Sequence, residues 1–525
     1  MYSFMLSWWF VISVNIILIP LTNSYIHPDE HYQSIEPLLK YVCNGLNKTL
    51  YNGSITWEYL TTSNLPIRSI TILRLYYELL IRSTMSLDPF EIILAVKYYN
   101  FTIFMITYLL YNKVFVKNKF NKRISKVLML GSYTLLTYQI RSFSNSIETV
   151  LLMLFLICLN SNSFFSLGLI FAIGIHNRIT FILWLILPCA YKAYQILLNK
   201  SLKSVVIYAV SLTVSLTLAI TIISKMDSLV YFNNEKFIFT PLENWKYNKN
   251  HSNLAKHGIH SRFNHLLINL PVLISPFVLL LIALTFKSNI FIENKLPLLT
   301  CISGLFFLSL FPHQEARFLI PLIPLFYSSI DFQILKVQYT KSTLAFKKRI
   351  LQFFILGHII FNILMLLIIG SWHQSGLITI TKNVSFLNTI NNNDIIFWHT
   401  LMPLHWPFYL NSVDKANLYI NFVDDEANEY GFRQLKTSHD LKQSHNIYDF
   451  MGVSTENFEY LINDLKIKKQ ESSIMMDLVI PTRFREDLDL LGYKYEITDH
   501  MPYHLNLNDG FDKSPLGLDI LKVVF

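Results

Sequence analysis

Charged side chains are scarce in this sequence, at 15% of its 525 residues, against about 25% in an average soluble domain. Hydrophobic residues make up 52% of the chain. A helix that crosses a bilayer needs roughly 20 apolar residues. Apolar runs of about this length recur along the chain as far as residue 371. A soluble globular protein is therefore excluded, and the composition indicates a polytopic membrane protein.

Paired cysteines and glycine-rich loops are also lacking. The four cysteines show no paired spacing, so the sequence signals neither a disulfide framework nor a zinc site. The missing glycine-rich phosphate loop argues against a soluble nucleotide as substrate. The net charge is +9, but Lys and Arg fall mostly in short connectors between apolar runs, as in cytoplasmic loops. We therefore expect no nucleic-acid partner.

The basic connectors orient the apolar segments. Residues 117–126, 192–203 and 341–349 are rich in Lys or Arg, and we expect them to be cytoplasmic. About eleven transmembrane helices follow from the hydropathy pattern. They are expected near 1–21, 98–116, 127–140, 147–161, 164–176, 179–191, 204–226, 265–286, 296–312, 318–335 and 350–371. The uncleaved N-terminus is then cytoplasmic and the C-terminus luminal.

Two parts of the chain are predicted to lie outside the membrane. The transmembrane domain, residues 1–371, includes a first luminal loop at 22–97, in which residues 67–81 have the pattern of an amphipathic helix on the membrane surface. Residues 372–525 are polar and fit a small mixed α/β luminal region. The Asn-x-Ser/Thr triplets at Asn47, Asn52, Asn250 and Asn383 fall on the luminal side, as expected of a glycoprotein, whereas Asn199 falls on the opposite side and Asn100 inside an expected span.

Polar side chains gather at the luminal ends of several expected spans. Charged groups at membrane depth are costly, so their grouping on one side indicates a polar cavity. Asp29 and Glu30 are the candidate catalytic carboxylates. The candidates for substrate binding are His27, Gln33, Arg141, Asn145, Arg178, Lys225, Asp227, His257, His260, Arg262, His313, Gln314, Glu315 and Arg317.

Each candidate also has a simpler explanation. Pro28 followed by two acidic residues is a common helix start. Arg178 and Arg317 fit side chains that reach from a helix end to the membrane interface. His257 and His260 are spaced for one helical face, but without further ligands a structural role is favoured over a metal site.

The combination of these groups favours glycosyl transfer from a lipid phosphate. A carboxylate can accept the proton of the attacking hydroxyl. Cations can stabilise the departing phosphate, and Arg178, Lys225, Arg262 and Arg317 are the candidates. The residues alone do not decide which carboxylate takes the proton or which cation meets the phosphate.

Four motifs resemble one enzyme family. They are His-Pro-Asp-Glu at 27–30, Arg-Ser-Phe-Ser-Asn-Ser-Ile-Glu at 141–148, Asn-Arg-Ile-Thr at 177–180 and His-Gln-Ser-Gly at 373–376. They are similar to stretches of the mannosyltransferases that use dolichyl phosphate mannose, which form glycosyltransferase family 22 within the C-type superfamily. Residues 253–262 and 313–319 further resemble the branch that adds a fourth, side-branch mannose in α1,2 linkage to the glycosylphosphatidylinositol (GPI) precursor, with Ser261 at a position that is usually proline.

The resemblance implies an all-α polytopic C-type glycosyltransferase fold and an inverting transfer in the endoplasmic-reticulum membrane. Asp29 is then the favoured base, and Glu30 beside it orients the substrate or shares the role. Dolichyl phosphate mannose and a GPI precursor glycolipid are the implied substrates, with no metal or cofactor. The alternatives are a sibling enzyme adding the third GPI mannose or an N-glycan mannose, a secondary transporter, and a non-catalytic assembly subunit.

Overall fold

The computed structural model describes residues 8–525 except 47–55, 62–64, 251–257, 259, 285–290, 292–293, 333–340, 384–393, 411–416, 425–428, 435–445 and 507–515. The chain forms two compact units. The first unit contains residues 1–19, 58–76 and 96–366, and the second contains residues 20–57, 77–95 and 367–525. Residues 20–57 of the expected first loop therefore group with the C-terminal residues, which the boundary expected at residue 371 did not anticipate.

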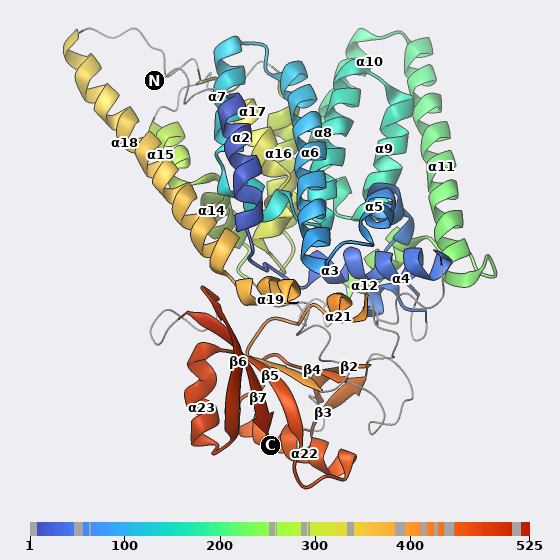
Figure 1. Cartoon of the computed structure of the whole chain (residues 1–525). Coiled ribbons are helices and arrows are strands. Elements are labelled where there is room, and N and C mark those ends of the chain that lie inside the picture. The colour runs from blue at the N-terminus through green and yellow to red at the C-terminus, as the bar shows by residue number, and fades with distance from the viewer. Residues whose placement is uncertain are drawn as a thin grey trace. The chain divides into compact units, whose positions relative to one another are not determined.

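Helices make up the first unit (Figure 1). They are α2 (Trp8–Leu18), α7 (Lys119–Leu130), α8 (Ser144–Ser161), α9 (Phe164–Asn177), α10 (Phe181–Asn199), α11 (Leu202–Phe232), α12 (Thr240–Lys249), α14 (Leu270–Ile274), α15 (Pro276–Leu284), α16 (Leu296–Ser309), α17 (Leu322–Ser329) and α18 (Lys341–Met365). Two more, α5 (Ile70–Thr84) and α6 (Pro89–Phe115), continue along the chain from one unit into the other. Helix α5 confirms a helix at 67–81, and its place on the membrane surface stays a prediction.

Five described helices are long and apolar enough to cross a membrane. They are α6, α8, α10, α11 and the segment Gln352–Trp372, which joins α18 to a π-helical turn, η7 (Leu366–Trp372). A sixth span is counted if His265–Ile274 and Pro276–Ala283 act together, although they bend by 105° at the break. The chain is thus a membrane protein, and the count of about eleven spans stays a prediction.

Besides the bent segment at 265–283, two more of the expected spans are not continuous helices. In place of 127–140, α7 begins inside the basic connector, because the Asn118 side chain accepts hydrogen bonds from the first backbone N–H groups. It ends before Gly131 and is followed by a separate π-helical turn, η3 (Leu135–Gln139). In place of 318–335 there is a 3-10 turn, η5 (Ala316–Leu319), and the eight-residue α17. Hydropathy over a window does not register such breaks.

Close helix packing in the first unit depends on small residues. A Cβ atom on Gly168 of α9 would lie 2.7 Å from the Leu212 carbonyl oxygen of α11. A Cβ atom on Gly304 of α16 would lie 2.0 Å from the Trp184 ring of α10. Small side chains that let helix backbones approach are typical of membrane bundles.

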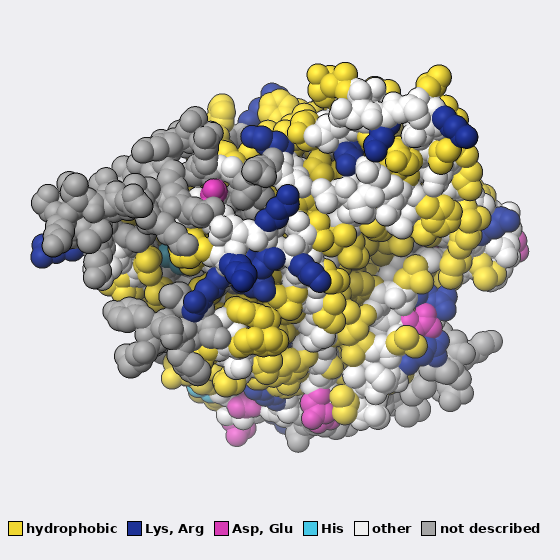
Figure 2. Space-filling model, turned by 90° about the horizontal axis from the view of Figure 1, so that it is seen from above, with side chains coloured by type: hydrophobic (Ala, Val, Ile, Leu, Met, Phe, Trp, Pro, Cys, Tyr) yellow, Lys and Arg dark blue, Asp and Glu magenta, His cyan; other side chains and the backbone are white. Residues whose placement is uncertain are grey.

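One end of the first unit is basic. Lys117, Lys119 and Arg123 of the first connector are exposed, as are Lys200 and Lys203 of the second. Figure 2 shows Lys and Arg side chains gathered on this face, among hydrophobic and uncharged polar side chains. The arrangement agrees with the distribution that the sequence predicts for cytoplasmic connectors.

The second unit contains a seven-stranded mixed sheet in the order β3-β2-β4-β1-β5-β7-β6. Strands β2, β4, β1 and β5 pair in parallel, and β3, β7 and β6 are antiparallel to their neighbours. The strands are β1 (Ile395–Trp398), β2 (Asn417–Asp424), β3 (Glu429–Gln434), β4 (Asn446–Phe450), β5 (Met475–Pro481), β6 (Lys494–Pro502) and β7 (Gly517–Val524). The helices of this unit are α3 (Asp29–Tyr32), α4 (Ile35–Leu46), α19 (Ser375–Thr379), α21 (Trp406–Tyr409), α22 (Thr455–Lys469) and α23 (Arg485–Leu490). The expected small mixed α/β region is therefore confirmed.

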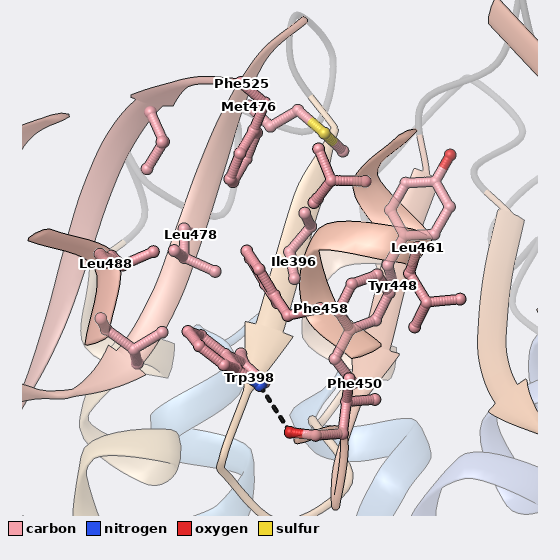
Figure 3. Close-up of a cluster of buried hydrophobic side chains, with 14 of the residues drawn as sticks. Ile396, Trp398, Tyr448, Phe450, Phe458, Leu461, Met476, Leu478, Leu488 and Phe525 are labelled. Atoms are coloured by element: carbon pink, nitrogen blue, oxygen red, sulfur yellow. Dashed lines mark hydrogen bonds between the residues drawn. The ribbon is translucent and has the colours of Figure 1, made fainter. Parts of the chain in front are cut away.

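An aromatic core joins this sheet to α22 (Figure 3). The Trp398 ring stacks on Phe458 of α22 at a centroid distance of 4.0 Å. The Trp398 indole also donates a hydrogen bond to the Val453 carbonyl at 2.9 Å. The polar edge of the tryptophan is thus satisfied inside an apolar cluster.

Candidate active site

The acidic motif begins a short helix, α3, in the second unit. Pro28 occupies the position before the helix, and Asp29 and Glu30 form its first turn. The backbone N–H of Asp29 donates to the His27 ring at 3.1 Å. The simple reading of Pro28-Asp29-Glu30 as a helix start is therefore correct, and it leaves a catalytic role open.

The two carboxylates of α3 differ in access. The Asp29 side chain is 24% exposed and lies 3.5 Å from His27 Nδ1. The Glu30 side chain is 3% exposed and lies 3.8 Å from His31 Nε2. Of the two carboxylates, that of Asp29 is therefore the more accessible from solvent. Gln33, at the end of the same helix, is buried.

Side chains far along the sequence surround this helix. Tyr32 and Glu36 contact His405, and Trp406 donates a hydrogen bond to His31. Burial raises the pKa of Tyr25 well above its usual value, and the carboxylates of Glu30 and Glu36 add to this effect. The sequence does not single out His405 or Trp406, because they lie hundreds of positions from their partners and no recognisable spacing links them.

A buried ion pair joins α8 to the end of α9 in the first unit. Arg178 Nε lies 3.5 Å from Glu148 Oε2, and its side chain is 11% exposed. Its guanidinium also donates to the Ser144 hydroxyl at 2.9 Å. The Asn145 amide reaches the same Glu148 carboxylate at 3.4 Å. The motifs at 141–148 and 177–180 therefore meet in space.

A second ionic cluster lies in the loop between α16 and η5. His313 Nε2 is 2.7 Å from Glu315 Oε1, and the same carboxylate binds the Arg317 guanidinium. Burial would lower the pKa of His313, but the Glu315 carboxylate outweighs this effect and raises the pKa above its usual value. The Glu315 carboxylate therefore stabilises the protonated form of His313.

Phe318 brings the two arginines together. The Arg178 guanidinium lies 5.2 Å from the centre of its ring and that of Arg317 lies 5.6 Å from it. Both distances are within the range of cation–π contact. Arg141 is 1% exposed. It lies close enough to Tyr138 to interact with it electrostatically, as do Glu315 and Arg317. Three predicted cationic residues thus belong to one region of the first unit.

Gln314 connects this cluster to a second loop. Its side-chain oxygen accepts from the His265 backbone N–H at 2.8 Å, and its amide lies within reach of the Arg262 carbonyl. The Gln314 backbone N–H donates to the His260 ring at 3.3 Å. Because the Gln314 amide is 1% exposed and hydrogen-bonded on both sides, it positions the loops. His265 was not anticipated, since it lies within an apolar run.

The remaining candidates are more dispersed. Lys225 and Arg262 are exposed. Asp227 is 0% exposed, and its carboxylate accepts from the backbone and hydroxyl of Thr71 at 3.0 and 2.6 Å. Asp227 therefore fastens α11 to the start of α5. His257 lies outside the described residues.

The chain is similar to several known proteins. Residues 6–407 match the Alg9-like mannosyltransferase family. GPI mannosyltransferase 4 of Candida glabrata is 32% identical over 97% of this chain and 97% of its own. GPI mannosyltransferase 4 of Saccharomyces cerevisiae is 32% identical over 92% and 91%. Among solved structures, ArnT from Cupriavidus metallidurans bound to undecaprenyl phosphate aligns with a TM-score of 0.50 at 9% identity, covering 98% of this chain and 97% of ArnT.

The helical fold is similar to that of ArnT. The chain belongs to the Alg9-like mannosyltransferase family. The predicted glycosyltransferase activity is thereby confirmed, as is the resemblance to the side-branch GPI enzymes. Among the described residues, no three His, Cys, Asp or Glu side chains gather as a metal site.

Proposed function

We propose that this chain is an inverting α1,2-mannosyltransferase that adds the fourth, side-branch mannose to the third mannose of a GPI precursor. The donor is dolichyl phosphate mannose. The observation that carries the proposal is the partly exposed Asp29 carboxylate at the start of α3, in a chain of a mannosyltransferase family. The names of the relatives support the choice of acceptor.

In the proposed reaction, Asp29 accepts the proton of the 2-hydroxyl on the third mannose. The oxygen attacks C1 of the donor mannose on the face opposite the phosphate. As the new C–O bond forms, the bond from C1 to the phosphate oxygen breaks and its electron pair stays with dolichyl phosphate. A β-linked donor thus gives an α-linked product without a covalent intermediate.

The leaving phosphate gains negative charge and needs cations or hydrogen-bond donors. Arg178 and Arg317 are the residues proposed for this role, because both lie within 6 Å of the same ring and Arg presents five donors in a fixed fork. The pairing with Glu148 and Glu315 fixes the orientation of each guanidinium. Lys225 and Arg262, being exposed, are weaker candidates.

The acceptor glycan requires hydrogen-bonding groups rather than charge. His260 and His313 come from two loops, and their rings lie 5.7 Å apart. His260 fits the role of an acceptor-binding residue. His313 meets Gly258 and Glu315 with its two ring nitrogens, so it fixes these loops together with Gln314. We place the reaction on the luminal side of the endoplasmic-reticulum membrane, with the N-terminus in the cytoplasm, as the basic connectors favour.

The proposal is tested by mannose transfer from dolichyl phosphate mannose to a purified trimannosyl GPI lipid. Asp29→Asn keeps the shape of the side chain but removes the base, so we expect kcat to fall about 10²- to 10⁴-fold. Glu30→Gln is the matched control, since it changes the neighbouring carboxylate in the same way. We expect a smaller loss from it. The reverse ranking would transfer the role of base to Glu30.

The choice of acceptor is tested separately with the wild-type enzyme. Transfer to a dimannosyl GPI lipid or an N-glycan precursor, with none to the trimannosyl lipid, would identify a sibling enzyme. A non-catalytic subunit predicts that Asp29→Asn complements a deletion strain as well as the wild type does. We expect loss of complementation with expression retained.

A further inference from the structure

A short segment of the C-terminal region contacts the helix that carries Asp29. Tyr32 of α3 donates a hydrogen bond from its hydroxyl to the Pro403 carbonyl at 2.6 Å. The same hydroxyl contacts His405 Nε2, and the two rings meet edge to face with centroids 4.6 Å apart. His405 Nδ1 lies 2.8 Å from Glu36 Oε1 in the following helix, α4. Tyr32, His405 and Glu36 thus form one continuous contact.

Burial makes this contact specific. The side chains of His405 and Glu36 are both 0% exposed, and Tyr32 is 3% exposed. A carboxylate can only accept, so the Nδ1–H of His405 donates to Glu36. The other ring nitrogen, Nε2, is the atom that contacts the Tyr32 hydroxyl. Leaving one of these groups without its partner in a buried place costs more than the bond itself contributes. The three side chains therefore have few alternative arrangements.

Further bonds join the same two segments. The Tyr25 hydroxyl donates to the Met402 carbonyl at 3.1 Å, and the Trp406 indole donates to the His31 ring at 3.4 Å. Before the helix, the Tyr25 backbone N–H donates to the His373 carbonyl at 2.9 Å. Residues from the C-terminal region thus bind both flanks of α3.

The length of α3 explains why it needs such support. The helix has four residues, and a single turn is unstable by itself because nucleation costs more than one turn of hydrogen bonds returns. Residues three apart lie near each other on a helix surface. Fixing the Tyr32 side chain therefore also fixes the rotation of α3 about its axis, and with it the direction of the Asp29 carboxylate.

We propose that His405, held by Glu36, is a positioning residue for the catalytic base and acts on Asp29 through Tyr32. The inference rests on the proposed function of Asp29. It gives the segment 401–406 a role in catalysis that is separate from its role in folding. A misplacement of about 1 Å can cost about 100-fold in rate, so a loosened α3 lowers kcat without abolishing substrate binding.

The experiment measures kcat, KM and thermal stability of the full-length enzyme. For His405→Gln we expect kcat to fall between about 10- and 100-fold with KM unchanged. Tyr32→Phe is a second variant, which keeps the ring and removes only the hydroxyl, and we expect it to lower kcat in the same direction. The matched control is His500→Gln. His500 Nδ1 lies 2.7 Å from Asp519 Oδ1, a pair of the same kind that is bound to β6 and β7, and we expect kcat to be unchanged.

A double variant separates positioning from a structural role. In the Asp29→Asn enzyme, His405→Gln should cause no further loss of rate, because the group that it positions has been removed. An equal loss in both backgrounds would overturn the proposal, as would wild-type kcat per folded molecule in both His405→Gln and Tyr32→Phe. If the wild type uses an acceptor other than the trimannosyl lipid, the proposed identity of the acceptor is wrong. The loss of rate caused by His405→Gln is then measured on that other acceptor, in the wild-type and Asp29→Asn backgrounds, and is judged in the same way.

Discussion

The arginine–carboxylate pairs of the first unit and the His405–Glu36 pair of the second unit are both largely shielded from solvent. They differ in how far apart the two partners lie in the sequence. Glu315 and Arg317 are two residues apart, and Glu148 and Arg178 are thirty residues apart. Glu36 and His405 are 369 residues apart. The first unit therefore builds its polar cluster from neighbouring helix ends, whereas the second unit needs the C-terminal region to complete the surroundings of its acidic helix.

Packing differs between the two units in a related way. Gly168 and Gly304 let helices of the first unit approach to backbone distance. In the second unit, Trp398 and Phe458 fill the space between the sheet and α22 with large rings. A bundle in lipid gains from close helix contact, while a sheet–helix core gains from burying apolar area. Each unit should accordingly respond to different substitutions.

The largest effect is expected from Arg178→Ala. The Glu148 side chain is 1% exposed, and removing one partner of a buried ion pair destabilises by about 3–5 kcal/mol. Thermal unfolding of the detergent-solubilised protein measures the change. Arg82→Ala is the control, because the Arg82–Glu78 pair is more exposed and should contribute no more than about 0.5 kcal/mol.

A double variant sharpens this result. Replacing Glu148 and Arg178 together by glutamine leaves no buried charge, so most of the lost stability should return. Equal destabilisation by Arg178→Ala and Arg82→Ala would show that the Glu148 pair is open to water. The contrast between the buried polar clusters of the two units would then need revision.

Both units were predicted from sequence in part. In the second unit, the motif at 27–30 predicted a helix start, and α3 begins at Asp29. For the first unit, the sequence placed Arg178 and Arg317 among the candidate cations. It did not predict that Arg178 pairs with Glu148, because several carboxylates were equally available as partners. The expected span at 265–286 was broken, since Ser275 adopts a φ of 89° that hydropathy does not register.

His405 shows why the rest could not be predicted. It lies in a segment with no charge pattern, and its partners are set by tertiary structure rather than by helical or strand spacing. Asp227 illustrates the converse limit. Its place near the end of an apolar run suggested substrate binding, but it is bound to Thr71. A polar residue at a helix end looks the same in sequence whether it binds a ligand or another helix.

An intermediate effect is expected from Gly304→Ala. The new Cβ would lie 2.0 Å from the Trp184 ring, and Trp184 is 0% exposed, so overpacking should cost about 1–3 kcal/mol. The comparison in the second unit is Phe458→Leu, which leaves a cavity beside the Trp398 ring and should cost at least about 1 kcal/mol. Thermal unfolding of both variants measures the difference. A neutral Gly304→Ala would mean that α10 and α16 adjust freely.

The smallest effect concerns pH and His313. Glu315 raises the pKa of His313 in the folded protein, so the pair stabilises the fold while His313 is protonated, and this contribution is lost as pH rises through the raised pKa. The pair is only partly buried, and its loss should amount to no more than about 1 kcal/mol.

Unfolding temperatures at pH 6 and pH 9 test this expectation, because these values lie about half a unit below and well above the usual histidine pKa. The unfolding temperature of the wild type should be lower at pH 9 by an amount that His313→Gln lacks. His504→Gln is the control, because burial lowers the pKa of His504 to about 3, with His373 adding to the effect, so that His504 is neutral at both pH values. An identical drop in His313→Gln and the wild type would show that the Glu315 pair carries no proton-dependent stability.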